Sequence, residues 1–328
     1  MKEYPLISVV TPSIRKENLD KYLNNIRRQD YPKEKLEIVV AWGLEDRIDD
    51  LKQKYDCHVI YNSIDDMEAR RRIAIEGASG EWIFMADDDN YFDNPSLIKN
   101  MYEAVSAEEA YAAECVWQSY KKEDYLINRY CALVGVYDPS VLYLNRQDHM
   151  GVHKKKWCLK GNVISENEKY FCVEFKPDEI PTMGDQGFLI RKNDMLLGVN
   201  GEAIMHMDVC MELSQQGKGK FIFMKDYYGH DCVKTKKQLL DKLKRNIDRF
   251  QVDGMDRKMN YDMSIGKMVK LGLILGTFVI PLKDAIVGYC SIKDKAWFIH
   301  PILCFQIAVM YTASTIKGLV FNKSKGKK

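Results

Sequence analysis

Three adjacent carboxylates, Asp87, Asp88 and Asp89, directly follow the apolar run at residues 82–86. Such a run is typical of a buried strand in a parallel sheet, and ligands of these sheets bind outside the carboxyl ends of the strands. Clustered carboxylates repel one another unless a cation lies among them, and their oxygens suit Mg²⁺ or Mn²⁺. In an extended chain Asp87 and Asp89 point to one side and Asp88 to the other. The triplet predicts a divalent-cation site, with a solvated acidic turn as the alternative.

The elements expected around this triplet alternate between strands and helices. Apolar runs predict strands at residues 6–12, 36–42, 58–61 and 82–86, and helical spacing predicts helices at residues 18–29, 48–55 and 67–77. This alternation implies right-handed βαβ units, and therefore an α/β fold with a parallel sheet and a nucleotide-type crevice. Neither GxGxxG nor GxxxxGK[ST] occurs in the sequence. A phosphate-bearing ligand would then need a metal and basic side chains to hold it.

Four short segments, in this order and spacing, together resemble a family 2 glycosyltransferase over roughly residues 5–232. They are SVVTP at 8–12, ARRR at 69–72, ASGEWI at 78–83 and ADDD at 86–89. The resemblance implies a GT-A fold, with a Rossmann-like, mostly parallel sheet flanked by helices. It also implies inverting, metal-dependent transfer of a sugar from a nucleotide diphosphate.

The resemblance implies roles for residues of the nucleotide half. The end of the first strand would contact the base, an arginine would hold the nucleotide, and the aspartates would bind the metal and the diphosphate. These positions are Thr11 and Pro12, Arg70, and Asp87, Asp88 and Asp89, with Asp87 and Asp89 as the metal ligands.

Two positions of this half depart from the family pattern. Arg71 stands where the family has asparagine, and AWGLED at 41–46 replaces the usual Asp-Asp-Gly-Ser. Glu45 or Asp46 would have to stand in for the acidic contact to the base. The alternative for residues 70–72 is a solvated helix face.

The second half supplies the candidate catalytic base. Inverting transfer needs a carboxylate that accepts the proton of the attacking acceptor hydroxyl. Residues 206–213 match the position of the family's Glu-Asp pair, where Met207 replaces the glutamate and leaves Asp208 as the base. Asp185 is the second candidate, and a helix N-terminal residue favoured by the macrodipole is the other interpretation of Asp208. His230 matches a histidine that approaches the metal or the diphosphate, although a structural hydrogen bond is the commoner role of a single histidine.

The overall charge of +2 hides an asymmetry between the body and the tail. Residues 234–328 hold 19 of the 49 Lys and Arg residues and 7 of the 47 Asp and Glu residues, a net charge of +12, which leaves −10 for residues 1–233. Residues 234–250 have the pattern of a basic amphipathic helix, and residues 296–316 contain no charged side chain. A basic tail with this apolar content favours a membrane surface over nucleic acid. Packing as a helical subdomain is the alternative.

The nine cysteines form no CxxC pair and show no metal-ligand spacing. They indicate reduced, buried thiols in a cytosolic compartment. The amino terminus leads directly into strand-like residues without the apolar region of a signal peptide. The expected location is the cytoplasmic face of the cell membrane.

These features predict a GT-A catalytic domain at residues 1–232, followed by a basic amphipathic helix and apolar membrane-associated helices at residues 233–328. Residues 1–110 would form the nucleotide-binding half of the catalytic domain, and residues 111–232 the acceptor half. The predicted activity is transfer from a UDP- or GDP-sugar to a glycan or polyprenyl-linked acceptor, in the synthesis of cell-surface polysaccharide or glycoconjugates. One alternative is a sugar-phosphate nucleotidyltransferase, which usually carries a glycine-rich loop where this chain has SIRK at 13–16. The other is a catalytically inactive membrane scaffold with the same fold.

Overall fold

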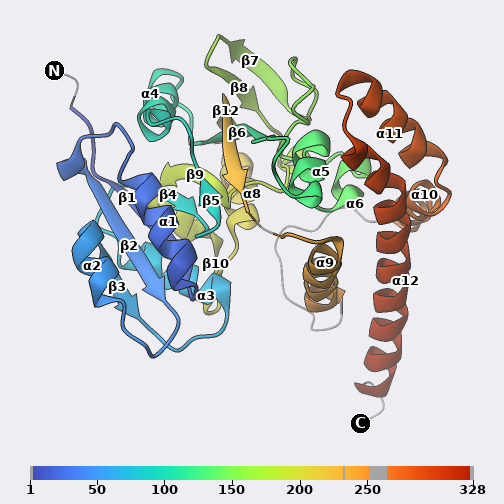
Figure 1. Ribbon diagram of the computed structural model, residues 1–328, viewed down its shortest axis with the longest axis horizontal. Coiled ribbons are helices and arrows are strands. Elements are labelled where there is room, and N and C mark those ends of the chain that lie inside the picture. Colours follow the sequence, from blue (N-terminus) through green and yellow to red (C-terminus); the bar gives the residue numbers. More distant parts are fainter. Residues whose placement is uncertain (1–2, 232, 252–263, 326–328) are drawn as a thin grey trace. The chain divides into compact units, whose positions relative to one another are not determined.

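A computed structural model describes residues 3–231, 233–251 and 264–325 of the 328-residue chain (Figure 1). The chain forms two compact units, each built from two separate stretches of sequence. The first unit combines residues 1–119 with residues 160–230, and the second combines residues 120–159 with residues 231–328. The domain boundary after residue 232 stays a prediction, because a compact unit is not by itself a domain that folds alone.

Four parallel strands form one half of the sheet in the first unit, in the order β3-β2-β1-β4 (Figure 1). They are β1 (Ile7–Ser13), β2 (Leu36–Trp42), β3 (His58–Tyr61) and β4 (Trp82–Ala86). The connections between them carry α1 (Lys16–Ile26), α2 (Asp49–Tyr55) and α3 (Met67–Glu76). Each of these elements lies within three residues of its predicted ends, which confirms the predicted α/β fold class.

The remaining strands make the sheet mixed. β9 (Gln186–Arg191) lies antiparallel between β4 and β6 (Ala112–Gln118), and β12 (Lys220–His230) runs parallel to β6. Antiparallel β8 (Tyr170–Glu174) and β7 (Asn162–Glu166) complete this edge. The end of β12 also pairs with the short strand β5 (Asn90–Tyr91). Because β5 directly follows the aspartate triplet, this pairing brings the end of β12 to the carboxyl end of β4.

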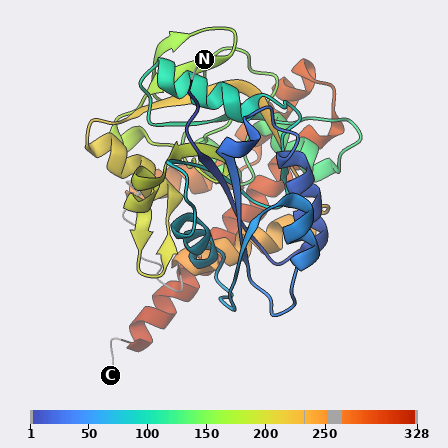
Figure 2. The ribbon, with the colours of Figure 1, turned by 90° about the vertical axis from the view of Figure 1, so that its left-hand side faces the viewer.

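Helices flank the sheet on both sides (Figures 1 and 2). In α1 the apolar side chains recur at helical spacing and are buried, so that α1, α2 and α4 (Leu97–Ala107) share one core with alternate residues of the strands, among them Val9, Val40 and Phe84. Helix α3 packs on β1 and β2 through buried residues that lie outside that core. The smaller elements are α7 (Lys192–Met195), α8 (His206–Gln215), β10 (Val199–Asn200), β11 (Ala203–Ile204), η1 (Lys33–Lys35), η2 (Pro177–Glu179) and η3 (Leu196–Gly198).

The second unit is helical in the part that the structure describes. Its elements are α5 (Leu126–Val134), α6 (Pro139–Tyr143), α9 (Lys236–Gln251), α10 (Ile265–Gly276), α11 (Val279–Ser291), η4 (Lys295–Ile299) and α12 (His300–Lys325). Buried polar groups connect α12 to the earlier helices. The His300 ring lies 2.8 Å from the Tyr130 hydroxyl and 2.9 Å from the Tyr143 hydroxyl, and Tyr143 donates to Asp284 over 2.9 Å. Helices from distant parts of the sequence therefore share one interior.

The apolar stripe of α9 is buried inside the second unit. Leu239, Leu243 and Ile247 are at most 6% exposed, and Ser314 of α12 donates a hydrogen bond to Asp248 of α9. Packing against other helices, rather than contact with a membrane, therefore accounts for this stripe.

One helical stretch among the described residues, Lys295–Lys317, is long and apolar enough to cross a membrane, and 39% of its most apolar part is buried. The preceding helical pair, Gly266–Gly276 and Val279–Ser291, is bent by 58°. The stretch Lys295–Lys317 thus agrees with the apolar segment predicted at residues 296–316.

Candidate active site

The strands β1 to β4 end at one side of the sheet of the first unit, called here the carboxyl edge. Thr11 and Pro12 do not end β1, which continues to Ser13, and both are buried in register with Val40 and Ala41 of β2. The residue at the true end of the first strand is therefore Ser13. The roles of Thr11 and Pro12 at the nucleotide base stay predictions.

The aspartate triplet forms a turn instead of continuing β4. The Asn90 backbone N–H donates to the Asp87 carbonyl over 3.0 Å, and the Asn90 side chain accepts from the Asp87 N–H over 3.0 Å. The side chains then separate in another way than predicted, since Asp88 and Asp89 both contact Arg15 whereas Asp87 pairs with Arg71. The predicted alternation is wrong, because the backbone turns at residue 88 and does not stay extended.

Asp87 pairs with a buried arginine of α3. The Arg71 side chain is fully buried, and its guanidinium donates to Asp87 over 2.8 Å and to Glu68 over 2.6 Å. Burial works against the charged form of Arg71, but the charges of Glu68, Asp87 and Asp185 outweigh it and hold the Arg71 pKa above its ordinary value. Burial raises the pKa of Asp87, and the nearby carboxylates of Asp89 and Asp185 act in the same direction against Arg71. Arg71 thus supplies the positive charge that this part of the carboxylate cluster needs.

Asp88 points back toward the end of β1. Its carboxylate accepts hydrogen bonds from the Ser13 hydroxyl and from the Arg15 guanidinium, and its side chain is 2% exposed. Burial raises the pKa of Asp88 to about 6, although Arg15 and Ser13 both favour the ionised form. Asp88 therefore connects the turn after β4 to the residues after β1.

Asp89 and His230 bring two possible metal ligands together. Asp89 Oδ1 lies 3.3 Å from His230 Nε2, and both side chains are at most 8% exposed. A hard divalent cation with octahedral bonds of about 2.1 Å places neighbouring ligand atoms about 3 Å apart. A carboxylate oxygen and an imidazole nitrogen at this separation fit two neighbouring ligands of Mn²⁺ or Mg²⁺. The other oxygen of Asp89 accepts from Arg15 over 3.1 Å, and this contact fixes the orientation of the carboxylate.

The side chain of Arg70, a residue of α3, lies against Gly43, which directly follows β2. It is 5% exposed, and its Nη1 donates to the Ile64 carbonyl over 2.6 Å. A Cβ atom at Gly43 would come within 2.6 Å of Arg70 Nη1 and 2.7 Å of Arg70 Cδ, so the glycine makes room for this side chain. Arg70 is thus held between two loops of the carboxyl edge, where its predicted nucleotide contact stays untested.

The two candidate bases lie on neighbouring segments of the first unit. Asp208 stands in the first turn of α8 and is 1% exposed. Asp185 precedes β9, its side chain is 31% exposed, and its charge acts on Arg71 and Asp87. Asp185 also lies 4.0 Å from His206, the first residue of α8. The structure therefore places Asp185 within electrostatic reach of the aspartate triplet and puts Asp208 in the interior two residues after His206.

Residues 8–159 match the sequence model of glycosyl transferase family 2. This region, which spans just under half of the chain, is a family 2 glycosyltransferase region. Among solved structures, it is similar to the mannosyltransferase PcManGT from Pyrobaculum calidifontis in complex with GDP-Man and Mn²⁺, at 13% identity and a TM-score of 0.55. That alignment covers 96% of this chain and 88% of PcManGT, and at this identity it shows the shared fold.

A more distant similarity is to residues 1–349 of TarS from S. aureus in complex with UDP-GlcNAc, at 10% identity and a TM-score of 0.45. It covers 92% of this chain and 90% of that one. No curated protein sequence matches the chain.

The sequence predicts no role for two residues of the candidate site. Arg15 lies in a loop without a motif, and Arg71 departs from the family pattern. A sequence signal existed for Arg71, since Glu68 three residues earlier can form an i,i+3 ion pair with it. Arg15 had no comparable signal, because its partners are more than 70 residues away in the sequence.

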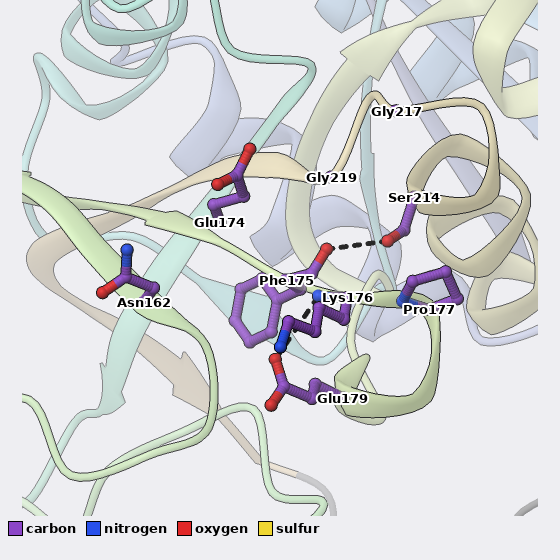
Figure 3. A pocket seen from close by; sticks show the side chains of 9 residues that line it. All are labelled: Asn162, Glu174, Phe175, Lys176, Pro177, Glu179, Ser214, Gly217 and Gly219. Carbon is purple, nitrogen blue, oxygen red and sulfur yellow. Dashed lines mark hydrogen bonds between the residues drawn. The ribbon is translucent and has the colours of Figure 1, made fainter.

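A separate depression of about 440 Å³ lies away from this site (Figure 3). It is lined by residues of β7, β8, η2 and the end of α8, and the Ser214 hydroxyl donates to the Phe175 carbonyl at its wall over 2.7 Å. Glu174 in its lining pairs with Lys220 at the start of β12, whereas His230 stands at the end of the same strand. The depression is therefore at the opposite edge of the sheet and contains none of the predicted site residues.

Proposed function

We propose that this glycosyltransferase transfers a sugar, with inversion, from a UDP- or GDP-sugar to a glycan or polyprenyl-linked acceptor, and that the reaction requires Mg²⁺ or Mn²⁺. The observation that carries the proposal is the 3.3 Å approach of Asp89 to His230 at the carboxyl edge. Ligands of open α/β sheets bind at this edge, and the donor atoms suit a divalent cation. A cation bound there would offset the negative charge of the leaving diphosphate.

The predicted site residues would have separate roles in this reaction. Asp89 and His230 would hold the cation, with Asp87 beside them in its pair with Arg71. Thr11, Pro12 and Arg70 would contact the nucleotide, and Asp88 would keep the turn of the triplet attached to β1. Asp208 would accept the proton of the acceptor hydroxyl as that oxygen attacks the anomeric carbon from the face opposite the diphosphate.

The acceptor proposal connects the site to the second unit. An enzyme that acts on a polyprenyl-linked acceptor must work at a membrane, and the apolar helices α10 to α12 support attachment there. We place the enzyme at the cytoplasmic face of the cell membrane, where nucleotide sugars would reach it, in the synthesis of cell-surface polysaccharide or glycoconjugates.

Product analysis with a panel of nucleotide sugars tests the proposal. The full chain is incubated with UDP- and GDP-sugars and a mixture of lipid-linked and soluble glycan acceptors, with Mn²⁺ or with a chelator. We expect one donor to be consumed only when the cation is present, and the anomeric configuration of the product to be inverted. Release of pyrophosphate from a nucleoside triphosphate and a sugar phosphate would favour a nucleotidyltransferase, and no turnover of any donor would favour an inactive scaffold.

A further inference from the structure

The diphosphate of a nucleotide sugar needs cationic groups that this fold does not supply through a glycine-rich loop. The connection from β1 to α1 is Ile14-Arg15, and Lys16 after it pairs with Asp50 on the outside. Two arginines of α3 are turned inward, since Arg70 is 5% exposed and Arg71 fully buried, and the third, Arg72, pairs with Glu76 over 2.6 Å. Arg15 differs from Arg70 and Arg71, because its side chain is 47% exposed.

Arg15 uses only one edge of its guanidinium to hold the aspartates. Its Nε and Nη2 groups donate to Asp88, and Nη2 also donates to Asp89 over 3.1 Å. A guanidinium carries five N–H donors. The hydrogen bonds of Arg15 to Asp88 and Asp89 use Nε and Nη2, and none of them uses the two donors on Nη1. The second edge of Arg15 therefore remains available to an anion that approaches from solvent.

The carboxylate of Asp89 lies between Arg15 and the predicted cation site. Asp89 presents Oδ2 to Arg15 and Oδ1 to His230. A diphosphate that binds a cation at Asp89 and His230 thus arrives beside a fixed guanidinium. Planar guanidinium groups bind phosphate oxygens in pairs, and such charge-assisted hydrogen bonds are stronger than neutral ones.

We infer that Arg15 is a diphosphate-binding residue of this enzyme and that it also fixes the orientation of Asp89 as a ligand. The inference rests on the proposed use of a nucleotide-diphosphate donor. The competing explanation is that Arg15 has a purely structural role and only neutralises the buried carboxylate of Asp88. The two differ in which ligand loses affinity when the guanidinium is altered.

The test compares Arg15→Gln and Arg15→Lys with Arg28→Gln, an exposed arginine just beyond the end of α1. Calorimetry with the full chain and saturating Mn²⁺ measures the affinity for UDP and GDP, and for UMP and GMP. We expect Arg15→Gln to weaken binding of the preferred nucleoside diphosphate at least ~10-fold, because it removes charge-assisted hydrogen bonds to phosphate. The corresponding monophosphate should change less than about threefold, since it lacks the second phosphate.

Arg15→Lys keeps the charge but loses the fork, so its loss of diphosphate affinity should be smaller than that of Arg15→Gln. Arg28→Gln should leave all four affinities unchanged. If Arg15→Gln does not fold in a thermal unfolding control, Arg15→Lys still decides, because it keeps a cation beside Asp88. A selective loss of diphosphate affinity in that variant supports the inference.

Equal loss of monophosphate and diphosphate affinity, or no loss of either, overturns the assignment of Arg15 while leaving the proposed function in place. If the wild-type chain binds no nucleoside diphosphate in the presence of Mn²⁺, the proposed function fails first and the inference fails with it.

Discussion

At the scale of single residues, the proposed cation site involves Asp89 more directly than its neighbours in the triplet. Asp87 pairs with Arg71, Asp88 and Asp89 both contact Arg15, and Asp89 is the member that approaches His230. The three carboxylates therefore have different surroundings, although they are identical in chemistry and adjacent in sequence. An arginine fits at position 71, where the family has asparagine, because its buried guanidinium pairs with both Glu68 and Asp87.

We predict that Asp89→Ala abolishes the Mn²⁺-dependent part of nucleoside diphosphate binding and leaves the fold intact. Losing one ligand of a carboxylate site removes most of the cation affinity, and the remaining carboxylates repel one another less. Calorimetry with and without Mn²⁺ measures the first effect and thermal unfolding the second. Asp93→Ala, at an exposed residue just after β5, is the matched control. Unchanged Mn²⁺-dependent binding in Asp89→Ala would remove Asp89 from the metal site.

The catalytic base is tested by comparing Asp208→Asn with Asp185→Asn. Each change keeps the shape of the side chain but removes its ability to accept a proton. We expect Asp208→Asn to lower kcat at least ~10²-fold with donor affinity changed less than about twofold. Asp185→Asn should instead alter donor affinity, because Asp185 acts electrostatically on Arg71 and Asp87. The reverse outcome would make Asp185 the base, in agreement with its greater exposure.

At the scale of elements, the stability of α3 matters because this helix carries the two buried arginines, Arg70 and Arg71. The helix begins after Asp66, whose side chain accepts from the Ala69 N–H over 2.9 Å. Removing such a cap costs about 1 kcal/mol of stability. We expect Asp66→Ala to lower the free energy of unfolding by about this amount in urea titrations, and Asp65→Ala, an exposed neighbour, to change it by less than about 0.5 kcal/mol. Equal effects of the two variants would mean that the cap does not stabilise α3.

Local periodicity predicted the parallel strands and their helices, because the spacing of apolar residues along a short segment shows which of its side chains will be buried. It could not decide between an extended triplet and a turn, because the turn depends on two hydrogen bonds of Asn90. The position of His230 was also beyond local patterns, since it requires β5 to pair with β12 almost 140 residues later. The stripe of α9 was visible in the sequence, but nothing in the helix itself distinguishes a protein partner from a bilayer.

At the scale of the whole molecule, the two units interleave along the chain. Residues 120–159 and 231–328 form one compact unit, although the motifs alone suggested a tail that begins at residue 233. A chain that ends at residue 232 would keep α5 and α6 but lack the helices that complete their unit. Buried side chains such as Ile127, Tyr130 and Leu133 would then lose their cover. Membrane attachment is therefore best measured on the full chain.

The surface of α10 to α12 is apolar with a basic border. Its exposed apolar side chains include Leu273, Val279, Val287, Phe305 and Val309. Between residues 264 and 317 the charged residues are six exposed lysines and two aspartates, and Asp284 and Asp294 accept hydrogen bonds from Tyr143 and Tyr120 within the unit. Lysines bordering an apolar surface favour an anionic bilayer, with a contribution of about 1 kcal/mol each that salt screens. We therefore expect the full chain to remain in the membrane pellet after a high-salt wash and to be released by detergent.

The last prediction concerns how these helices meet the bilayer. Helices α10 and α11 contain 12 and 13 residues, or about 18 and 20 Å, which is shorter than the roughly 30 Å hydrocarbon core. Helix α12 is long enough, but its His300 face contacts Tyr130 and Tyr143 inside the unit. A helix held in this way favours attachment along the surface over a crossing.

Cys290 and Cys158 are both exposed thiols of the second unit, and Cys290 stands near the end of α11. On anionic vesicles with the protein added from outside, a membrane-impermeant maleimide should label both cysteines without detergent. Cys290→Ser and Cys158→Ser assign the signals. Labelling of Cys158 alone, with Cys290 appearing only after detergent, would show that α10 to α12 insert as a membrane hairpin, since the turn after α11 would then lie in the vesicle lumen.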